Sequence, residues 1–87
     1  MAYKIEYASS VEKDLRKVPQ DVALKAISLV REKIAPNPHI GVPLKGKYRE
    51  LRKFRFGTYR IIYSIIKDRI TIYVLRIRHR KDVYLGL

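Results

Sequence analysis

Residues that bind phosphate and stack on bases are concentrated in the second half of the chain. Arginines and lysines alternate with tyrosines and phenylalanines between positions 48 and 63, and positions 76–81 add three arginines, a histidine and a lysine. An arginine side chain presents a planar fork of N–H donors to phosphate oxygens, and aromatic rings stack on unpaired bases. This interleaving favours the binding of single-stranded RNA or another polyphosphate.

The distribution of charge supports the same interpretation. The formal net charge is +12, but residues 1–44 hold seven Lys or Arg against five Asp or Glu, a net of +2, whereas residues 45–87 hold thirteen against three, a net of +10. Positive charges at this density repel one another, and the binding of phosphate reduces that repulsion and is favoured by the release of counterions. A solvated basic surface and an acidic protein partner are the alternatives that the charge leaves open.

A two-residue turn at Gly57-Thr58 fixes which basic side chains share a face. In that register Arg55 lies opposite Arg60, and Lys53 lies on the same face of the sheet. Like charges directly opposite each other destabilise a sheet, so this arrangement indicates a site for an anion.

The last strand ends in a second group of candidates. We expect its end to lie beside the start of the preceding strand, which brings His79 and Arg80 towards Arg60, and Tyr84 is close enough in sequence to fold back over the same place. The predicted catalytic set is Lys53, Arg60, His79, Arg80 and Tyr84.

The chemistry of this set is defined by the absence of clustered carboxylates. Two-metal phosphoryl transfer needs oxygen ligands, and glycosidases need paired carboxylates. The chain has no cysteine and only two histidines, so we expect no metal and no other cofactor. Arginine, lysine, histidine and tyrosine suit metal-free cleavage of RNA by its own 2′-hydroxyl, in which arginines stabilise the charged phosphorus centre and neighbours transfer protons.

The elements that must position these residues form an α+β fold of order β-α-α-β-β-β. Residues 2–7 alternate as a strand, and Ser9 and Glu12 have the spacing of a capping box at the start of a short helix. Pro19 is expected in the first turn of a second helix, which ends before the proline-rich loop 36–47. The remaining strands are expected at 48–56, 59–67 and 70–78.

These elements predict a four-stranded, largely antiparallel sheet, with the helical hairpin packed on one face and the other face open for binding. At 87 residues the chain, 1–87, is expected to be a single domain. It shows no apolar leader and no run of about 20 apolar residues, so we expect a cytoplasmic protein with no membrane contact.

Two motifs resemble a known family. Residues 55–63 (RFGTYRIIY) are similar to the R-x-G-x-Y-R-[IV]-[IV]-Y signature of RelE/ParE superfamily toxins, and residues 78–84 (RHRKDVY) resemble their terminal H-R-x-x-x-Y. Segments 3–7, 15–19 and 43–46 also resemble the family, so the likeness spans the whole chain. It implies a microbial-ribonuclease-like fold and a toxin of a type II toxin–antitoxin system, whose acidic cognate antitoxin would mask the basic site.

The resemblance also implies roles for three residues. Arg60 corresponds to the phosphate-binding arginine of RelE-like members, Arg80 to their second catalytic arginine, and Tyr84 to the tyrosine that orients or activates the nucleophile. RelE-like members are ribosome-dependent endoribonucleases that cut mRNA in the A site, whereas ParE-like members inhibit DNA gyrase and lack the nuclease set. The presence of both arginines and the tyrosine favours the RelE-like activity.

The general base is left open by the resemblance. Lys53 matches one of two basic strand lysines of the family, but Leu51 stands where the other is expected. His79 could take its place. A gyrase-directed inhibitor and a non-catalytic RNA-binding module are the alternative functions. Further contacts to ribosomal RNA or mRNA are expected from the other basic residues of this half: Lys45, Lys47, Arg49, Arg52, Arg55, Arg78 and Lys81.

Overall fold

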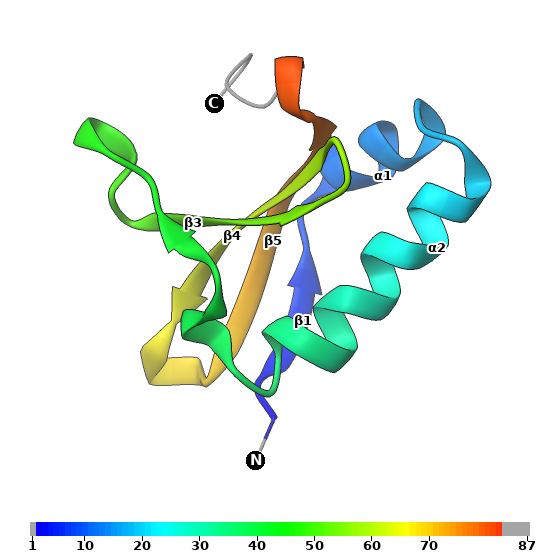
Figure 1. The fold of residues 1–87 in the computed structure, drawn as a ribbon. Helices are drawn as coiled ribbons and strands as arrows, with labels where there is room; N and C mark the ends of the chain where they lie inside the picture. Colours follow the sequence, from blue (N-terminus) through cyan, green and yellow to red (C-terminus); the bar gives the residue numbers. More distant parts are fainter. Residues whose placement is uncertain (1, 83–87) are drawn as a thin grey trace.

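A computed structural model describes residues 2–82. Its centre is a five-stranded mixed sheet in the order β1-β5-β4-β3-β2, and the helices cover one face of it (Figure 1). The strands are β1 (Lys4–Tyr7), β2 (Val42–Pro43), β3 (Leu51–Phe56), β4 (Tyr59–Ile66) and β5 (Thr71–His79). The helices are α1 (Ser9–Arg16) and α2 (Gln20–Leu29), with a π-helical turn at Val30–Ile34 and short 3-10 turns at Pro38–Ile40, Gly46–Tyr48, Lys67–Arg69 and Arg80–Asp82.

The α+β class and the element order are confirmed, but the strand count is corrected from four to five. β1 pairs in parallel with β5, and the other pairs are antiparallel. The additional strand, β2, lies within the segment expected to be a loop and pairs Val42 with Lys53 and Pro43 with Arg52. Proline has no N–H to donate to a neighbouring strand, so it is found in edge strands, at the first residue of a strand or at bulges. β2 is an edge strand of this sheet.

The hairpin of β3 and β4 has the predicted register. Gly57, in the left-handed region with φ +57°, forms the two-residue turn with Thr58, and Arg55 pairs with Arg60 as expected. β3 begins at Leu51 rather than at residue 48, because residues 46–48 form a 3-10 turn. Between β4 and β5 the register shifts at Ile62/Tyr63, which is a β-bulge.

The capping box expected for the first helix is wrong. Ala8 occupies the N-cap position, with no side-chain cap hydrogen bond. The hydroxyl of Ser10 instead donates to the carbonyl oxygen of Leu75, at 2.7 Å, and so ties α1 to β5. Pro19 is the N-cap residue of α2, one position before the first turn in which it was expected.

The helical face of the sheet carries the main core. Ala26, Val30 and Ile34 lie four residues apart along α2 and the π-helical turn, and they pack against apolar residues of β4 and β5. The wider π-helical turn brings Ala35 inward together with Ile34, and both are buried. No helix within residues 2–82 is long and apolar enough to cross a bilayer.

The opposite face of the sheet is partly covered by a second, smaller apolar cluster. Leu44 and Ile62 are buried there, with Tyr48 and Leu51 packed against them. The backbone N–H of Leu44 donates to the carbonyl of Leu51, which holds residues 44–48 over the start of β3. The rest of this face, towards the β3–β4 turn, is left to basic side chains.

Candidate functional site

A row of three arginines crosses the sheet on the face opposite the helices. Arg55 on β3 pairs with Arg60 on β4, and Arg60 pairs with Arg78 on β5. Side chains at directly opposite positions lie about 5 Å apart at Cβ and share a face. Lys53 lies two residues before Arg55 and therefore belongs to the same face, where it pairs with Ile62 and Val42. We call Lys53, Arg55, Arg60 and Arg78 the basic row.

Arg80 lies at the same end of the sheet as the basic row. Its backbone N–H donates to the carbonyl oxygen of Thr58 at 2.7 Å, so the residue that follows β5 is fastened to the β3–β4 turn. The side chain of Arg80 is exposed. The backbone of Arg80 is thus placed beside Thr58, two residues before Arg60, whereas Tyr84 lies outside the described residues.

A buried carboxylate, which the sequence reasoning missed, holds two of the arginines on β5. Asp14 on α1 is only 2% exposed. Its oxygens accept hydrogen bonds from Arg76 (Nη2 2.8 Å, Nε 3.0 Å), from Arg78 (Nε 3.4 Å) and from the backbone N–H of Ile77 (3.0 Å). The sequence signal was a charged residue three positions after Val11 in the apolar stripe of the helix.

His79 does not join the basic row, which corrects the expectation of one cluster. It pairs with Tyr59, one residue before Arg60, and consecutive strand residues point to opposite faces. The rings of His79 and Tyr59 meet edge to face at 5.5 Å, and Tyr59 stacks on Phe56, which packs against the helical core. Nδ1 of His79 accepts a hydrogen bond from the backbone N–H of Lys81 at 3.2 Å.

Arg52 also lies on the face away from Lys53, because it pairs with Tyr63. Its Nη1 donates to the carbonyl oxygen of Gly41 at 2.6 Å and approaches that of His39 at 3.4 Å. Arg52, for which an RNA contact was expected, therefore holds the segment 38–41 on the face away from the basic row.

Tyr63 on β4 also holds the segment 38–41. Its hydroxyl donates to the carbonyl of Pro38 at 2.6 Å and accepts from the N–H of Gly41 at 3.0 Å. Burial raises the pKa of this phenol above its ordinary value near 10, and the Gly41 hydrogen bond and the charge of Arg52 oppose that rise only in part. Tyr63 is fully buried, so its neutral form is the one that the fold uses.

The other predicted RNA contacts lie on exposed turns beside the basic row. Lys45, Lys47 and Arg49 are exposed around the 3-10 turn Gly46–Tyr48, where Lys47 Nζ lies 5.2 Å from the centre of the Tyr48 ring. A pocket of about 500 Å³ separates this turn from Lys53. Lys81 is exposed in the turn that follows β5.

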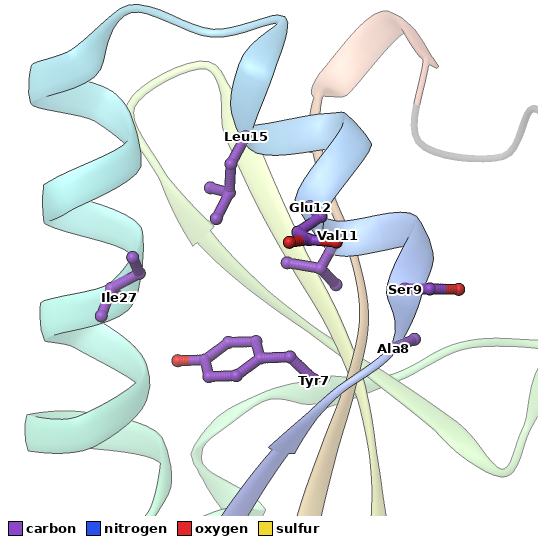
Figure 2. A pocket seen from close by; sticks show the side chains of 7 residues that line it. All are labelled: Tyr7, Ala8, Ser9, Val11, Glu12, Leu15 and Ile27. Carbon is purple, nitrogen blue, oxygen red and sulfur yellow. The ribbon is translucent and has the colours of Figure 1, made fainter.

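An apolar pocket of about 330 Å³ lies on the helical side of the sheet, between β1, α1 and α2 (Figure 2). The ring of Tyr7 points from the end of β1 towards Ile27 on α2, and Val11 and Leu15 line the α1 side. Burial raises the pKa of Tyr7, with opposition from the charge of Arg31. The lining includes no arginine or lysine, so this pocket is no candidate for phosphate chemistry.

Electrostatics define what the basic row can do. Within residues 2–82 no group of three or more His, Cys, Asp or Glu is placed to hold a metal ion. Asp14, a buried carboxylate beside Arg78, is already engaged by arginines and a backbone N–H. The row therefore offers guanidinium and ammonium donors to a phosphate, and these donors also stabilise the added negative charge of a five-coordinate phosphorus.

The fold and the basic row together define a class of small α+β proteins that present an arginine-lined sheet face. The sequence family described as "ParE toxin of type II toxin-antitoxin system, parDE" matches residues 5–84. The chain belongs to this RelE/ParE family of toxins of type II toxin–antitoxin systems.

Related sequences and structures agree with this assignment. Toxin RelG of Mycobacterium tuberculosis is 28% identical over 85 residues, which are 97% of this chain and 98% of the relative, and Toxin RelE of the same organism is 26% identical over 94% and 86%. The toxin–antitoxin complex RelBE2 of M. tuberculosis contains a chain that superposes with a TM-score of 0.86 at 26% identity, covering 92% of this chain and 100% of that one. The isolated Escherichia coli RelE toxin, at 21% identity over 90% and 84%, shares the fold with a TM-score of 0.75.

Proposed function

We propose that this toxin is an endoribonuclease that cleaves mRNA in the ribosomal A site. The observation that carries the proposal is the basic row, which places Lys53, Arg55, Arg60 and Arg78 on one sheet face across three strands. Like charges at opposite positions, such as Arg55 and Arg60, destabilise a sheet, whereas a bound phosphate turns their repulsion into favourable contacts. Activity at the ribosome also agrees with the expected cytoplasmic location.

The proposed reaction needs no metal. The 2′-oxygen of the RNA attacks the adjacent phosphorus, the bond from phosphorus to the 5′-oxygen breaks, and the products are a 2′,3′-cyclic phosphate and a 5′-hydroxyl. Arg60 and Arg80 bind the phosphate and neutralise the charge that develops on its oxygens. One proton leaves the 2′-hydroxyl and another reaches the leaving 5′-oxygen, so a base and an acid are both required.

Lys53 and Tyr84 are the groups that we assign to proton transfer and to orienting the 2′-hydroxyl. Lys53 lies on the face of Arg60, and the comparison with family motifs gives Tyr84 its role. We leave His79 out of this set because its ring packs on Tyr59 at the opposite face and its Nδ1 accepts from the backbone of Lys81.

An acidic antitoxin is the proposed protein partner. The solved M. tuberculosis relative is a toxin–antitoxin complex, and so is a RelB–RelE complex from Methanococcus jannaschii that is 28% identical to this chain over 90% of it and 93% of that chain, with a TM-score of 0.66. The net charge of +10 in residues 45–87 suits a partner of opposite sign.

The test is mRNA cleavage in a purified translation system. Wild-type protein is expected to cut message at codons in the A site, and the Arg60→Ala/Arg80→Ala variant is expected to lose roughly 10³-fold or more in rate. Lys25→Ala, which removes an exposed charge from α2, is the matched control and should cleave like wild type. Intact message with wild-type protein would refute the function, and full activity of the double variant would refute the site.

Inhibition of DNA gyrase is the second candidate, and the match of residues 5–84 to the ParE toxin family favours it. A supercoiling assay with purified gyrase separates the two functions. Trapped cleaved DNA together with intact mRNA would support the gyrase-directed activity, whereas cleaved mRNA and normal supercoiling would support the nuclease.

A further inference from the structure

A mixed polar and apolar pocket of about 410 Å³ lies on the helical face, directly behind the basic row. Its walls come from the end of α1 and from the ends of β4 and β5 that lie nearest the Gly57-Thr58 turn. Its volume is in the range of pockets that hold small ligands. Its lining residues are Asp14, Lys17, Val18, Tyr59, Ile77, Arg78 and His79.

Aromatic rings form one wall of this pocket. Tyr59 and His79 contact each other edge to face at 5.5 Å, and Phe56 stacks on Tyr59 from the other side at 5.8 Å. The tyrosine is therefore held in a fixed orientation by two neighbours, and both rings of the pocket are half-buried rather than enclosed. A ring that is fixed and still reachable can stack on an unpaired base of any sequence.

The end of α1 adds one exposed cation to the lining. Lys17 is exposed there, whereas Arg78, which also lines the pocket, has its Nε 3.4 Å from Oδ1 of Asp14. Asp14, the carboxylate among the described lining residues, already accepts hydrogen bonds from Arg76, Arg78 and the N–H of Ile77, so its charge is compensated within the protein. The pocket thus combines stacking surfaces with an exposed lysine, a combination that proteins use to bind single-stranded nucleic acids.

The position of the pocket links it to the proposed cleavage site. Tyr59 and Arg60 are consecutive residues of β4, with Cα atoms about 3.8 Å apart, and their side chains point to opposite faces. His79 is the last residue of β5, and Arg80, whose backbone N–H donates to the carbonyl oxygen of Thr58, begins the 3-10 turn that follows. A single RNA strand that crosses this end of the sheet meets the arginines on one side and the aromatic pocket on the other.

We propose that this pocket binds a nucleobase of the RNA, adjacent to the phosphate held by the basic row. The inference rests on the proposed nuclease function, because the pocket then positions the strand that is cut. Tyr59 and His79 contact the base, and Lys17 contacts a neighbouring phosphate or an acceptor atom of the base. His79 is a binding residue in this arrangement.

The test is a titration of the ¹⁵N-labelled full chain with adenosine 5′-monophosphate, followed by amide chemical shifts, with inorganic phosphate as the comparison. Saturable shifts of Lys17, Val18, Tyr59, Ile77 and His79 are expected with the nucleotide and not with phosphate at equal concentration. Tyr59→Leu should weaken the nucleotide Kd by at least about tenfold, since stacking on one ring contributes that much or more. Tyr59→Phe, which keeps the ring, and Lys13→Ala, an exposed charge elsewhere on α1, should both bind like wild type.

Three outcomes would overturn the proposal. These are shifts confined to the basic row, an equal response to phosphate alone, or a response of the pocket to polyglutamate and not to the nucleotide, which would assign it to an acidic protein segment.

Because this titration contains no ribosomes, its result is independent of whether the nuclease function holds. In ribosomal cleavage, Tyr59→Leu is then expected to raise KM about tenfold with kcat unchanged, whereas a variant damaged only in its fold would lose both. A loss confined to kcat would contradict the binding role.

Discussion

Asp14 on α1 and Arg76 on β5 form a buried ion pair, with Oδ1 and Nη2 2.8 Å apart across 62 positions of sequence. The second carboxylate oxygen accepts from Arg76 Nε and from the backbone N–H of Ile77. Pairing between β1 and β5 ends at Tyr7 and Val74, so the edge of β5 beyond that point has lost its strand partner. Asp14 replaces the missing strand at this edge and supplies the acceptor that a buried N–H requires.

Replacing Asp14 with asparagine is expected to lower the free energy of unfolding by roughly 2–4 kcal/mol. Breaking a fully buried ion pair can cost more than this, but the Arg76 side chain remains partly accessible to water, which lowers the loss. Urea unfolding followed by circular dichroism measures the change.

The exposed pair between Glu6 and Arg69 supplies the control. Its atoms are 3.6 Å apart and both side chains are about half exposed, so Glu6→Gln should change stability by less than about 1 kcal/mol. Equal losses in the two variants would show that Asp14 carries no special role at the edge of β5.

Tyr63 predicts a loss of stability in alkali. Burial raises its pKa in the folded state, so stability is complete below the unfolded value near 10 and is lost as pH rises through the folded pKa. Tyr63→Phe should be less stable by about 1–3 kcal/mol at neutral pH, since the Gly41 N–H loses its acceptor.

The shape of the pH curve distinguishes this phenol from the others. Between about pH 9 and pH 11, the urea midpoint of Tyr63→Phe should fall less steeply than that of wild type. Tyr7→Phe is the comparison, because Tyr7 also has a raised pKa but is 41% exposed. Parallel curves for wild type and Tyr63→Phe would contradict the assignment.

Gly41 has no room for a side chain, although its backbone is extended and any residue could adopt it. A Cβ there would lie 2.5 Å from the hydroxyl oxygen of Tyr63 and 2.8 Å from the carbonyl oxygen of Lys53. Gly41→Ala is therefore expected to destabilise the fold by about 1–3 kcal/mol, through steric overlap.

A double-mutant cycle tests that cause. Removing the hydroxyl in Gly41→Ala/Tyr63→Phe relieves the shortest contact and leaves those to the Lys53 carbonyl and, at 3.0 Å, to the ring Cε1, so the double variant should be more stable than the sum of the single effects predicts. Thermal unfolding of the four proteins gives the coupling, and strict additivity would exclude a clash with the hydroxyl.

The pairing of Arg55 with Arg60 could be predicted from the sequence. The face on which His79 lies and the existence of β2 were not predicted. A two-residue turn leaves one possible pairing, so Arg55 opposite Arg60 followed directly from Gly57-Thr58. Nearness to the strand end does not decide the face of His79, because it alternates with Arg78 along β5 and pairs with Tyr59 rather than with Arg60.

The other misses have physical causes in long-range contacts. β2 is two residues long and contains a proline, so no alternation could reveal it, and its pairing depends on the contacts that Tyr63 and Arg52 make to residues 38–41. The Ser9 capping signal failed because the helix begins at Ser9 itself, with Ala8 at the N-cap, and the tie of Ser10 to Leu75, 65 positions away, has no local signal. Local patterns carry no information about such partners.

Ile70 is strained in the turn between β4 and β5. It has φ +50° and ψ +51°, a left-handed conformation that is unfavourable for a β-branched residue, and its side chain is 50% exposed. Ile70→Asn should raise the free energy of unfolding by about 1 kcal/mol, because asparagine adopts this conformation more easily. Ile70→Val keeps the branch and should give no gain. An unchanged melting temperature for Ile70→Asn would show that Ile70 packing outweighs the strain.

Arg52 and Lys53 are neighbours in β3, but their side chains point to opposite faces. Substitution of Arg52 is therefore expected to affect stability, and substitution of Lys53 the rate of cleavage. Arg52→Ala removes the contacts to Gly41 and His39, so it should lower stability by about 1–3 kcal/mol. Lys53→Ala leaves those contacts in place and should lower the rate of mRNA cleavage by roughly 10²-fold at nearly unchanged stability.

Urea unfolding and ribosomal cleavage of both variants, at a temperature where each is folded, check this pair. Lys53→Arg keeps the charge but raises the pKa of the group far above that of lysine, so it should restore RNA binding and not the cleavage rate if Lys53 transfers a proton. Full recovery of cleavage by the arginine would reduce the role of Lys53 to phosphate binding. A cleavage defect in Arg52→Ala as large as that of Lys53→Ala would contradict the division of the two faces.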